Sequence, residues 1–184
     1  MRTPDPHPDS DPGTPTGTRA LLERIVHDWQ HASPGLDPSP MLTYLLIDRL
    51  HAAMERRVNR TYTPSGLNPA TWDLLVTLRR SAPPAGLTPT ELSELTAITG
   101  ASITNRIGRL LERGLIERKI DDLDRRSNRI RLSERGRALA DQLIPEHLQN
   151  EREMFSVLTA DEIRTLETLA GRLLASLEPG PTPE

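Results

Sequence analysis

Residues 101–132, ASITNRIGRLLERGLIERKIDDLDRRSNRIRL, carry the pattern that decides the fold. Apolar residues recur at helical spacing over about 101–113, and Gly114 then ends the helix. Two β-prone segments, 115–120 and 129–132, follow on either side of a polar tip. Such segments around a polar turn predict a β-hairpin directly after the helix.

A second short helix precedes this stretch. Thr88-Pro-Thr-Glu91 has the pattern of a capping box with proline at the first helical position. Leu92, Leu95 and Ile98 continue the apolar stripe, and Gly100 ends it. Two short helices joined by a tight turn and followed by a hairpin predict a winged helix-turn-helix. The expected fold class is therefore mainly α (α+β), a winged helix-turn-helix with flanking dimerisation helices.

Composition narrows the class of protein. The chain has 184 residues, 17 prolines and no cysteine. Eight of the prolines lie in residues 1–19 and 179–184, which have almost nothing to bury, so we expect disordered tails there. The lack of cysteine excludes disulfides, cysteine-based zinc sites and thiol catalysis. No apolar run is long enough to span a membrane, and the N-terminus lacks the apolar segment of a secretory signal, so we expect a cytoplasmic protein.

Further helices flank the winged segment. Residues 41–60 predict a long helix with apolar residues on two opposite faces. One face holds Leu42, Leu45, Leu46, Leu50 and Ala53, and the other holds Tyr44, Ile47, His51, Met54 and Val58. A helix that is apolar on both sides must be covered on both sides. We expect one face to pack on its own domain and the other on a second copy of the chain.

The chain is expected to divide into a central DNA-binding lobe and flanking helices. Helices are predicted at about 68–80, from 133 toward 155, and from the second capping box at Thr159 to about 177. The predicted segments are a tail over 1–19, N-terminal helices for ligand and dimer contacts over 20–62, the winged lobe over 63–140, C-terminal dimerisation helices over 141–178, and a tail over 179–184.

Basic charge is concentrated on the winged segment. Residues 99–137 carry eleven lysines and arginines against six acids, a local charge of +5, whereas the rest of the chain carries −8. The overall charge of −3 is therefore compatible with a positive potential on the winged segment, which suits binding to a phosphate backbone. An enzyme is disfavoured because the sequence has no HExxH, GxSxG, phosphate loop or Rossmann glycine pattern. A winged-helix protein–protein adaptor is the remaining rival, although it would not need this charge segregation.

The second helix of the motif has a buried stripe and an opposite polar face. The stripe contains Ile103, Ile107, Leu110 and Leu111, and the polar face contains Ser102, Asn105 and Arg109, with Thr104 at the boundary. Hydroxyl, amide and guanidinium groups suit base reading in a major groove. Arg125 and Arg126 at the hairpin tip suit insertion into a narrow minor groove. The alternatives are an ordinary solvated helix face and a solvent-exposed tip charge.

The wing segment, LIERKIDDLDRRSNRIRLSERG at 115–136, resembles the signature of the MarR family of transcriptional regulators. Leu123 departs from the polar residue usual in that family. The similarity covers 20–178 and is closest to the urate-responsive, HucR-like branch. The motifs that carry it are LLERIVHDW, GLNPATWDLL, TNRIGRLLERGLIER and DDLDRR. The resemblance implies a homodimeric repressor that binds palindromic double-stranded operator DNA and releases it when urate binds.

The resemblance also implies an effector site of Trp29, Asp73, Arg106 and Arg118. This set suits a planar purine anion, because an aromatic ring, two guanidinium groups and a carboxylate match its ring, its oxygens and its N–H. The helical angle of Arg106 turns it half inward, where Asp73 is a plausible partner. The alternative is a structural Asp73–Arg106 salt bridge with Trp29 in the core. Another aromatic acid is the alternative effector.

Histidines suggest two further roles. His51 lies midway along the face assigned to the dimer, so two imidazoles near a two-fold axis would resist double protonation and form a pH-sensing candidate. A neutral packed histidine is the alternative. His27 and His31 lie four residues apart without a third ligand, so an exposed helix face is expected rather than a metal site. We expect no catalytic residue, no metal and no cofactor other than the effector.

Overall fold

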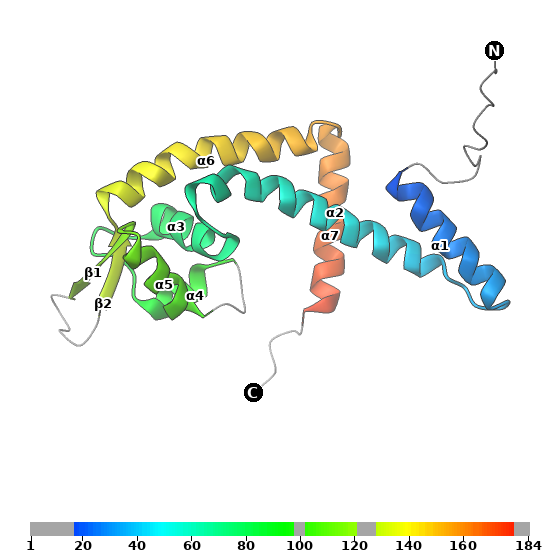
Figure 1. Ribbon diagram of the computed structural model, residues 1–184, viewed down its shortest axis with the longest axis horizontal. Helices are drawn as coiled ribbons and strands as arrows, with labels where there is room; N and C mark the ends of the chain where they lie inside the picture. The colour runs from blue at the N-terminus through cyan, green and yellow to red at the C-terminus, as the bar shows by residue number, and fades with distance from the viewer. Residues whose placement is uncertain (1–16, 98–101, 121–127, 179–184) are drawn as a thin grey trace, which may run out of the picture. The chain divides into compact units, whose positions relative to one another are not determined.

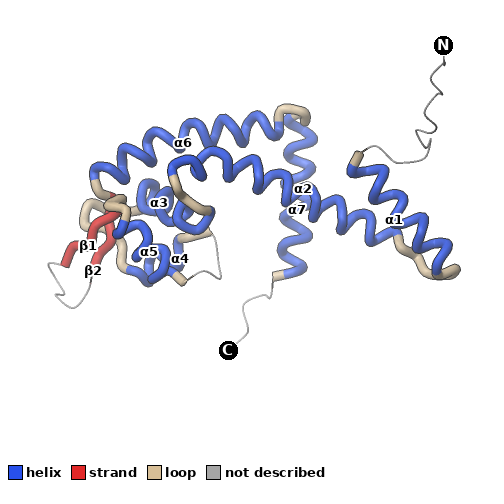
Figure 2. The backbone as a smooth tube through the Cα atoms, viewed as in Figure 1, coloured by secondary structure: helices blue, strands red, loops and turns tan. Residues whose placement is uncertain are grey.

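The computed structural model describes residues 17–97, 102–120 and 128–178. It divides into two compact units, one up to Met54 and one from Glu55 onward, with the boundary inside α2. The elements in chain order are α1 (Thr18–Ala32), α2 (Ser39–Tyr62), the short 3-10 helix η1 (Thr63–Ser65), α3 (Pro69–Ser81), α4 (Pro89–Leu95), α5 (Ile103–Glu112), β1 (Ile116–Ile120), β2 (Asn128–Leu132), α6 (Glu134–Phe155) and α7 (Ala160–Leu177) (Figure 1). The predicted fold class is confirmed: the described chain is mainly helical, with one small antiparallel hairpin (Figure 2).

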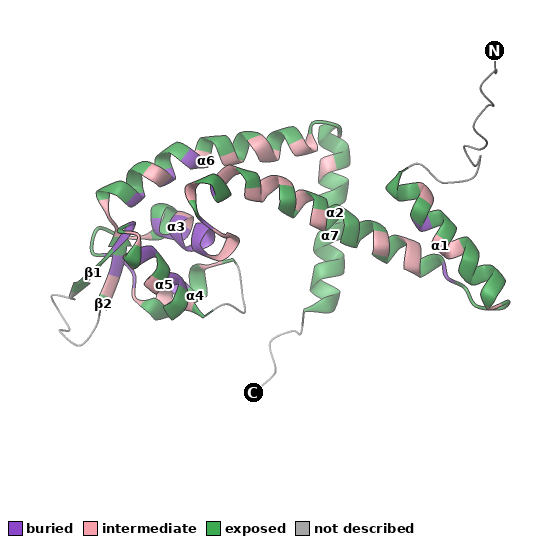
Figure 3. Ribbon diagram, in the orientation of Figure 1, coloured by how far each residue is buried: buried purple, intermediate pink, exposed green. Residues whose placement is uncertain are grey.

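Helix α3 is the scaffold of the second unit. It packs on α4, α5, α6 and β2 and carries seven buried residues. The core around it draws on almost every element of the lobe, as the buried positions in Figure 3 show. This core contains Tyr62, Leu67, Trp72, Leu74, Leu75, Leu78, Leu87, Leu92, Ile107, Leu110, Leu115, Ile116, Ile130, Ala140 and Leu143. The helix-turn-helix and the wing are thus held on one scaffold.

Local signals define the helix starts. The Asn68 side chain accepts a hydrogen bond from the Thr71 N–H, and the Thr71 hydroxyl accepts one from the Asn68 N–H. Each such pair satisfies two backbone donors that a helix N-terminus otherwise leaves unpaired. The capping boxes predicted at Thr88 and Thr159 are both confirmed. Helix α1 begins at Thr18, inside the segment predicted as a tail, and most of that tail lies outside the described residues.

The wing is a two-stranded antiparallel hairpin that is fastened to the lobe by an extra bridge. Glu117 pairs with Arg131 and Arg118 with Ile130 in the register. Leu87 exchanges two backbone hydrogen bonds with Ile130, of 2.9 and 2.7 Å, and extends the sheet by one bridge. Gly86 makes this approach possible, because its φ is +93° and an added Cβ would lie 2.6 Å from the Ile130 carbonyl oxygen. The predicted hairpin is confirmed, with strand limits shifted by one residue.

Apolar side chains lie uncovered on α7 and on the N-terminal part of α2. No residue of α7 is buried. Exposed leucines on it are Leu166, Leu169, Leu173, Leu174 and Leu177. In the first unit, Tyr44, Leu46, Ile47 and Leu50 of α2 are exposed as well. Both predicted faces of α2 therefore include residues that the single chain leaves open. Among the described helices none combines the length and apolarity that crossing a bilayer requires.

Candidate functional site

Helix α5 separates its residues as a recognition helix requires. Ile107 and Leu110 are buried against the lobe, whereas Ser102, Thr104, Asn105 and Arg109 are exposed. Ser102 is the N-cap residue, and its side chain makes no capping hydrogen bond. Its hydroxyl is therefore not committed to the helix end. Side chains that project from the N-terminal end of such a helix are the ones that reach base edges in a major groove.

The wing adds exposed cations beside this helix. Arg118 and Lys119 on β1 and Arg131 on β2 are exposed. Arg131 donates two hydrogen bonds to the Glu117 carboxylate, of 2.9 and 3.1 Å, across the hairpin. Arg125 and Arg126, which were predicted to enter a minor groove, lie outside the described residues.

Asp73 and Arg106 meet inside the lobe. The Arg106 Nη1 lies 3.5 Å from the Asp73 Oδ2, and the two residues are 4 % and 7 % exposed. The other carboxylate oxygen of Asp73 accepts a hydrogen bond of 3.2 Å from the Ala97 N–H, just after α4. One carboxylate on α3 therefore holds both the segment that follows α4 and the recognition helix α5. The pairing of Arg106 with Asp73 that the sequence suggested is present in the structure.

The other two residues of the predicted effector site, Arg118 and Trp29, belong to different compact units. Arg118 lies in β1 and is exposed. Trp29 lies in α1, within the first compact unit, and is 42 % exposed. The single chain therefore leaves Trp29 partly open to solvent. The structure brings together Asp73 and Arg106 from the predicted set.

The three histidines singled out from the sequence are exposed residues of the first unit. His51 on α2 is exposed. His27 and His31 are exposed too, with ring centroids 4.2 Å apart. Within the part of the chain that the structure describes, no group of three or more histidine or carboxylate side chains is placed to hold a metal ion.

Two sets of contacts that hold the lobe together were not predicted from the sequence. Arg113, the C-cap residue of α5, donates to the Ser65 carbonyl and, at 2.7 Å, to the Gly66 carbonyl. This contact ties the end of the recognition helix to η1. An aromatic cluster of Tyr62, Trp72 and His147 lies in the lobe, with Tyr62 and Trp72 stacked at 5.3 Å. No local pattern predicts either feature, because the partners lie far apart in the chain.

A helix-turn-helix on a helical scaffold, followed by a two-stranded wing, defines the lobe as a winged-helix DNA-binding module. A sequence model of the MarR family matches residues 65–127. The transcriptional regulator PecS of Dickeya dadantii is 32% identical over 149 residues, which cover 81% of this chain and 90% of PecS. The chain belongs to the MarR family and is a DNA-binding transcriptional regulator.

Other relatives agree with this membership. The multiple antibiotic resistance protein MarR of Escherichia coli K12 is 29% identical over 132 residues, which cover 70% of this chain and 88% of that protein. The structure of Bordetella bronchiseptica BpsR, described with its regulation by 6-hydroxynicotinic acid, matches with a TM-score of 0.60 and 26% identity, over 70% of this chain and 89% of that one. The fold also matches Staphylococcus aureus MepR in its DNA complex, with a TM-score of 0.63 and 21% identity over 72% and 96% of the chains. The expectation that the chain is not an enzyme is confirmed by these relatives, which are regulators.

Proposed function

We propose that the protein is a homodimeric repressor that binds palindromic duplex DNA and releases it when urate or a related purine anion binds. The observation that carries this proposal is the buried contact between Asp73 and Arg106, because one carboxylate joins the scaffold to both parts of the helix-turn-helix. A ligand that takes over either side chain changes how the recognition helix is held.

Dimerisation accounts for the uncovered apolar side chains. Five leucines of α7 are exposed in the single chain, and Leu177 is 73 % exposed. Uncovered apolar surface of this kind marks an interaction site in a soluble protein. A second copy of the chain supplies an apolar surface of the same kind. Two recognition helices related by a two-fold axis then read two half-sites about one helical turn apart, which makes the operator a palindrome.

The effector is argued from the chemistry of the four residues. A purine anion offers ring oxygens to the guanidinium groups of Arg106 and Arg118 and an N–H to the carboxylate of Asp73. Trp29 on α1 offers an exposed indole for stacking against the planar ring. Because Asp73 also accepts the Ala97 N–H, its engagement by a ligand acts on both helices of the DNA-binding motif. A coupling of about 1–3 kcal/mol, or about 5- to 150-fold in DNA affinity, is sufficient.

A second candidate effector is another aromatic acid. The regulation of the relative BpsR by 6-hydroxynicotinic acid favours this alternative. The same residues would hold such an acid through its carboxylate, with the guanidinium groups as donors. Urate and 6-hydroxynicotinate differ in their ring N–H groups, so they differ in the hydrogen bonds that they can donate to the Asp73 carboxylate.

Titration of effectors against a protein–DNA complex tests the proposal. A duplex selected by the purified protein from a random library serves as the operator, and fluorescence anisotropy reports binding. We expect urate to weaken binding in the parent and to have little effect in Asp73→Asn and Arg106→Ala. Variants that respond like the parent would refute the site assignment. Calorimetry with urate, xanthine, salicylate and 6-hydroxynicotinate then ranks the ligands by affinity. In the anisotropy experiment, DNA binding that does not weaken with added salt would point to the protein–protein adaptor alternative.

A further inference from the structure

Arg129 of the wing strand β2 contacts two parts of the helix-turn-helix region. Its Nη1 donates a hydrogen bond of 3.1 Å to the Gly86 carbonyl, in the loop that leads into α4. The same Nη1 lies 3.7 Å from the Glu91 Oε2, in the first turn of α4. One guanidinium therefore connects the wing, the loop and the first helix of the DNA-binding motif.

The carboxylate that Arg129 meets is fixed by the cap of α4. The Glu91 Oε2 accepts a hydrogen bond of 2.7 Å from the Thr88 N–H, which is part of the capping box. The side chains of Arg129 and Glu91 are 25 % and 45 % exposed. Ion pairs this open to solvent contribute little to stability. The contact is better explained by the geometry that it imposes, because the helix cap holds its acceptor in place.

Pairing within the hairpin does not account for Arg129. The register places Glu117 opposite Arg131, and these two residues form a cross-strand ion pair of 2.9 Å. It places Lys119 opposite Arg129. Like charges directly opposite each other destabilise a strand pair. The charge of Arg129 thus suits the Glu91 carboxylate of the lobe and not its neighbour in the hairpin.

The wing depends on contacts with the lobe for its orientation. A two-stranded hairpin on its own is only marginally stable in water. Backbone hydrogen bonds between Leu87 and Ile130 fasten one point of β2, and the Ile130 side chain is buried. Arg129, the neighbouring residue on the same strand, adds a second point of attachment. Two points restrict a tilt that the backbone bridge alone would leave open.

We propose that Arg129 is a positioning residue for the wing. It sets the angle at which the hairpin leaves the lobe, and thereby the base pairs beside the recognition helix that the wing reaches. Its guanidinium acts through Gly86 and Glu91 and not through a contact with DNA. The inference rests on the expected contact between the wing and the operator, and it needs neither the dimer nor the effector of the proposed function.

Distances between two spin labels test the orientation without DNA. Because the chain has no cysteine, Glu94→Cys on α4 and Asn128→Cys on β2 provide the two labelling positions, and both residues are exposed. The labelled full-length protein is diluted with an excess of unlabelled protein, so that double electron–electron resonance reports distances within one chain. We expect a narrow distance distribution in the parent and a broader or displaced one in Arg129→Gln. An unchanged distribution would overturn the proposal.

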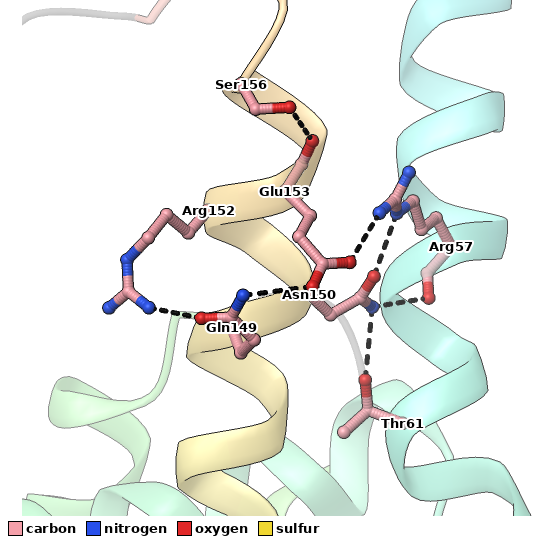
Figure 4. Close-up of polar contacts among 7 residues, drawn as sticks. All are labelled: Arg57, Thr61, Gln149, Asn150, Arg152, Glu153 and Ser156. Atoms are coloured by element: carbon pink, nitrogen blue, oxygen red, sulfur yellow. Dashed lines mark hydrogen bonds and ion pairs between the residues drawn. The ribbon is translucent and has the colours of Figure 1, made fainter.

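Arg57 is the matched control, because its guanidinium also joins two elements of the second unit. Its Nε donates to the Asn150 Oδ1 at 2.9 Å, and its Nη2 lies 3.2 Å from the Glu153 Oε2. Figure 4 shows this contact between α2 and α6, in which the labelled residues belong neither to the wing nor to α4. Arg57→Gln should therefore leave the label distances unchanged. An equal broadening in Arg57→Gln and Arg129→Gln would show that the whole lobe had loosened and would overturn the assignment.

Binding to two duplexes tests the consequence for DNA. One is the duplex selected by the protein, and the other is trimmed to the base pairs that α5 protects in the major groove. In anisotropy the parent should bind the trimmed duplex about tenfold more weakly, because the wing has lost its groove. Arg129→Gln should bind the selected duplex about fivefold more weakly than the parent does, and the trimmed duplex equally well. Equal losses on both duplexes, or a parent that does not distinguish them, would overturn the proposal.

Two further variants separate positioning from a direct contact with phosphate. Glu91→Gln keeps an oxygen for the cap of α4 and removes the charge that Arg129 meets. It should weaken binding to the selected duplex, whereas an arginine that contacts DNA directly would bind at least as well once released from Glu91. Arg129→Lys keeps the charge but lacks the branched guanidinium, so it should restore only part of the affinity and of the narrow distance distribution. Either variant with the full affinity of the parent would overturn the positioning role.

Discussion

The carboxylate of Asp73 on α3 lies 3.5 Å from the guanidinium of Arg106 on α5, and both side chains are buried. Burying two charges costs several kcal/mol per ion, which their attraction repays only in good geometry. The pair is therefore not explained by stability alone. Its position suits a contact that a ligand replaces, because the same carboxylate also holds the Ala97 N–H.

Removal of one charge from this pair should destabilise the lobe. Arg106→Ala leaves the Asp73 carboxylate buried without its guanidinium, and we expect a loss of about 3–5 kcal/mol in the free energy of unfolding. Denaturant unfolding at a fixed protomer concentration measures it, since the proposed dimerisation would make stability depend on concentration. Arg79→Ala breaks the Arg79–Asp141 ion pair, which is much more exposed, and should cost less than about 1 kcal/mol. Equal losses in the two variants would contradict the assigned role of burial.

Two glycines should respond to alanine in opposite directions. Gly86→Ala places a Cβ 2.6 Å from the Ile130 carbonyl oxygen at a φ of +93°, so we expect a loss of about 1–3 kcal/mol. Gly108 lies inside α5, and an added Cβ meets no atom of the described residues within 4 Å. Gly108→Ala should therefore gain about 0.5–1 kcal/mol from reduced chain entropy. Thermal unfolding measures the change in stability of both variants. A Gly86→Ala variant as stable as the parent would show that the Leu87–Ile130 bridge tolerates displacement.

The elements of the lobe were predictable because their signals are local. The capping boxes at Thr88 and Thr159 involve residues three positions apart, and the hairpin follows from adjacent β-prone segments. The contact between Asp73 and Arg106 could be suggested from a helical angle, because the sequence left one charged residue turned toward the interior. Periodicity and capping therefore account for most of the fold.

Contacts between distant segments could not be predicted. Arg113 meets the Ser65 and Gly66 carbonyls only because η1 and the end of α5 are brought together by the core. The bridge between Leu87 and Ile130 has the same origin. Trp29 was assigned to the effector set by resemblance alone, and its exposure is a property of the folded chain that helical spacing does not define.

Arg109 should contribute directly to DNA affinity. It is exposed on the face of α5 opposite the buried stripe, where a guanidinium reaches base edges. We expect Arg109→Ala to weaken specific binding by about 1–3 kcal/mol and to relax the preference at one base position. Arg152→Ala removes an exposed charge from α6 and is the matched control. If both variants lose the same affinity, Arg109 acts only through the net charge.

The capping box of α7 should make stability depend on acidity. The backbone N–H of Thr159, with its hydroxyl, holds the pKa of the Glu162 carboxylate below its ordinary value. A carboxylate whose pKa is lower in the folded state stabilises that state above its unfolded pKa of about 4.3, and this contribution disappears as the pH falls through the folded value. Glu162→Gln should therefore lower the melting temperature at pH 6, and its difference from the parent should narrow as the pH falls below about 4.3. Glu167→Gln, on the same helix outside the box, controls for the loss of one charge. A difference for Glu162→Gln that stays constant as the pH falls below about 4.3 would contradict the assignment.

The exposed leucines of α7 should carry the dimer. Leu169 and Leu173 lie one turn apart on its apolar face and are exposed in the single chain. A glutamate at position 173 would be buried without a partner in an apolar interface, which costs several kcal/mol. We therefore expect Leu173→Glu to shift the protein from dimer to monomer at micromolar concentration in sedimentation analysis, with its helix content retained. Thr168→Glu places the same charge on the opposite side of α7 and should leave the dimer intact. Because a monomer presents one recognition helix, Leu173→Glu should also lose most of its affinity for a palindrome. It should bind a single half-site as weakly as the parent does. A Leu173→Glu variant that remains dimeric would locate the interface elsewhere.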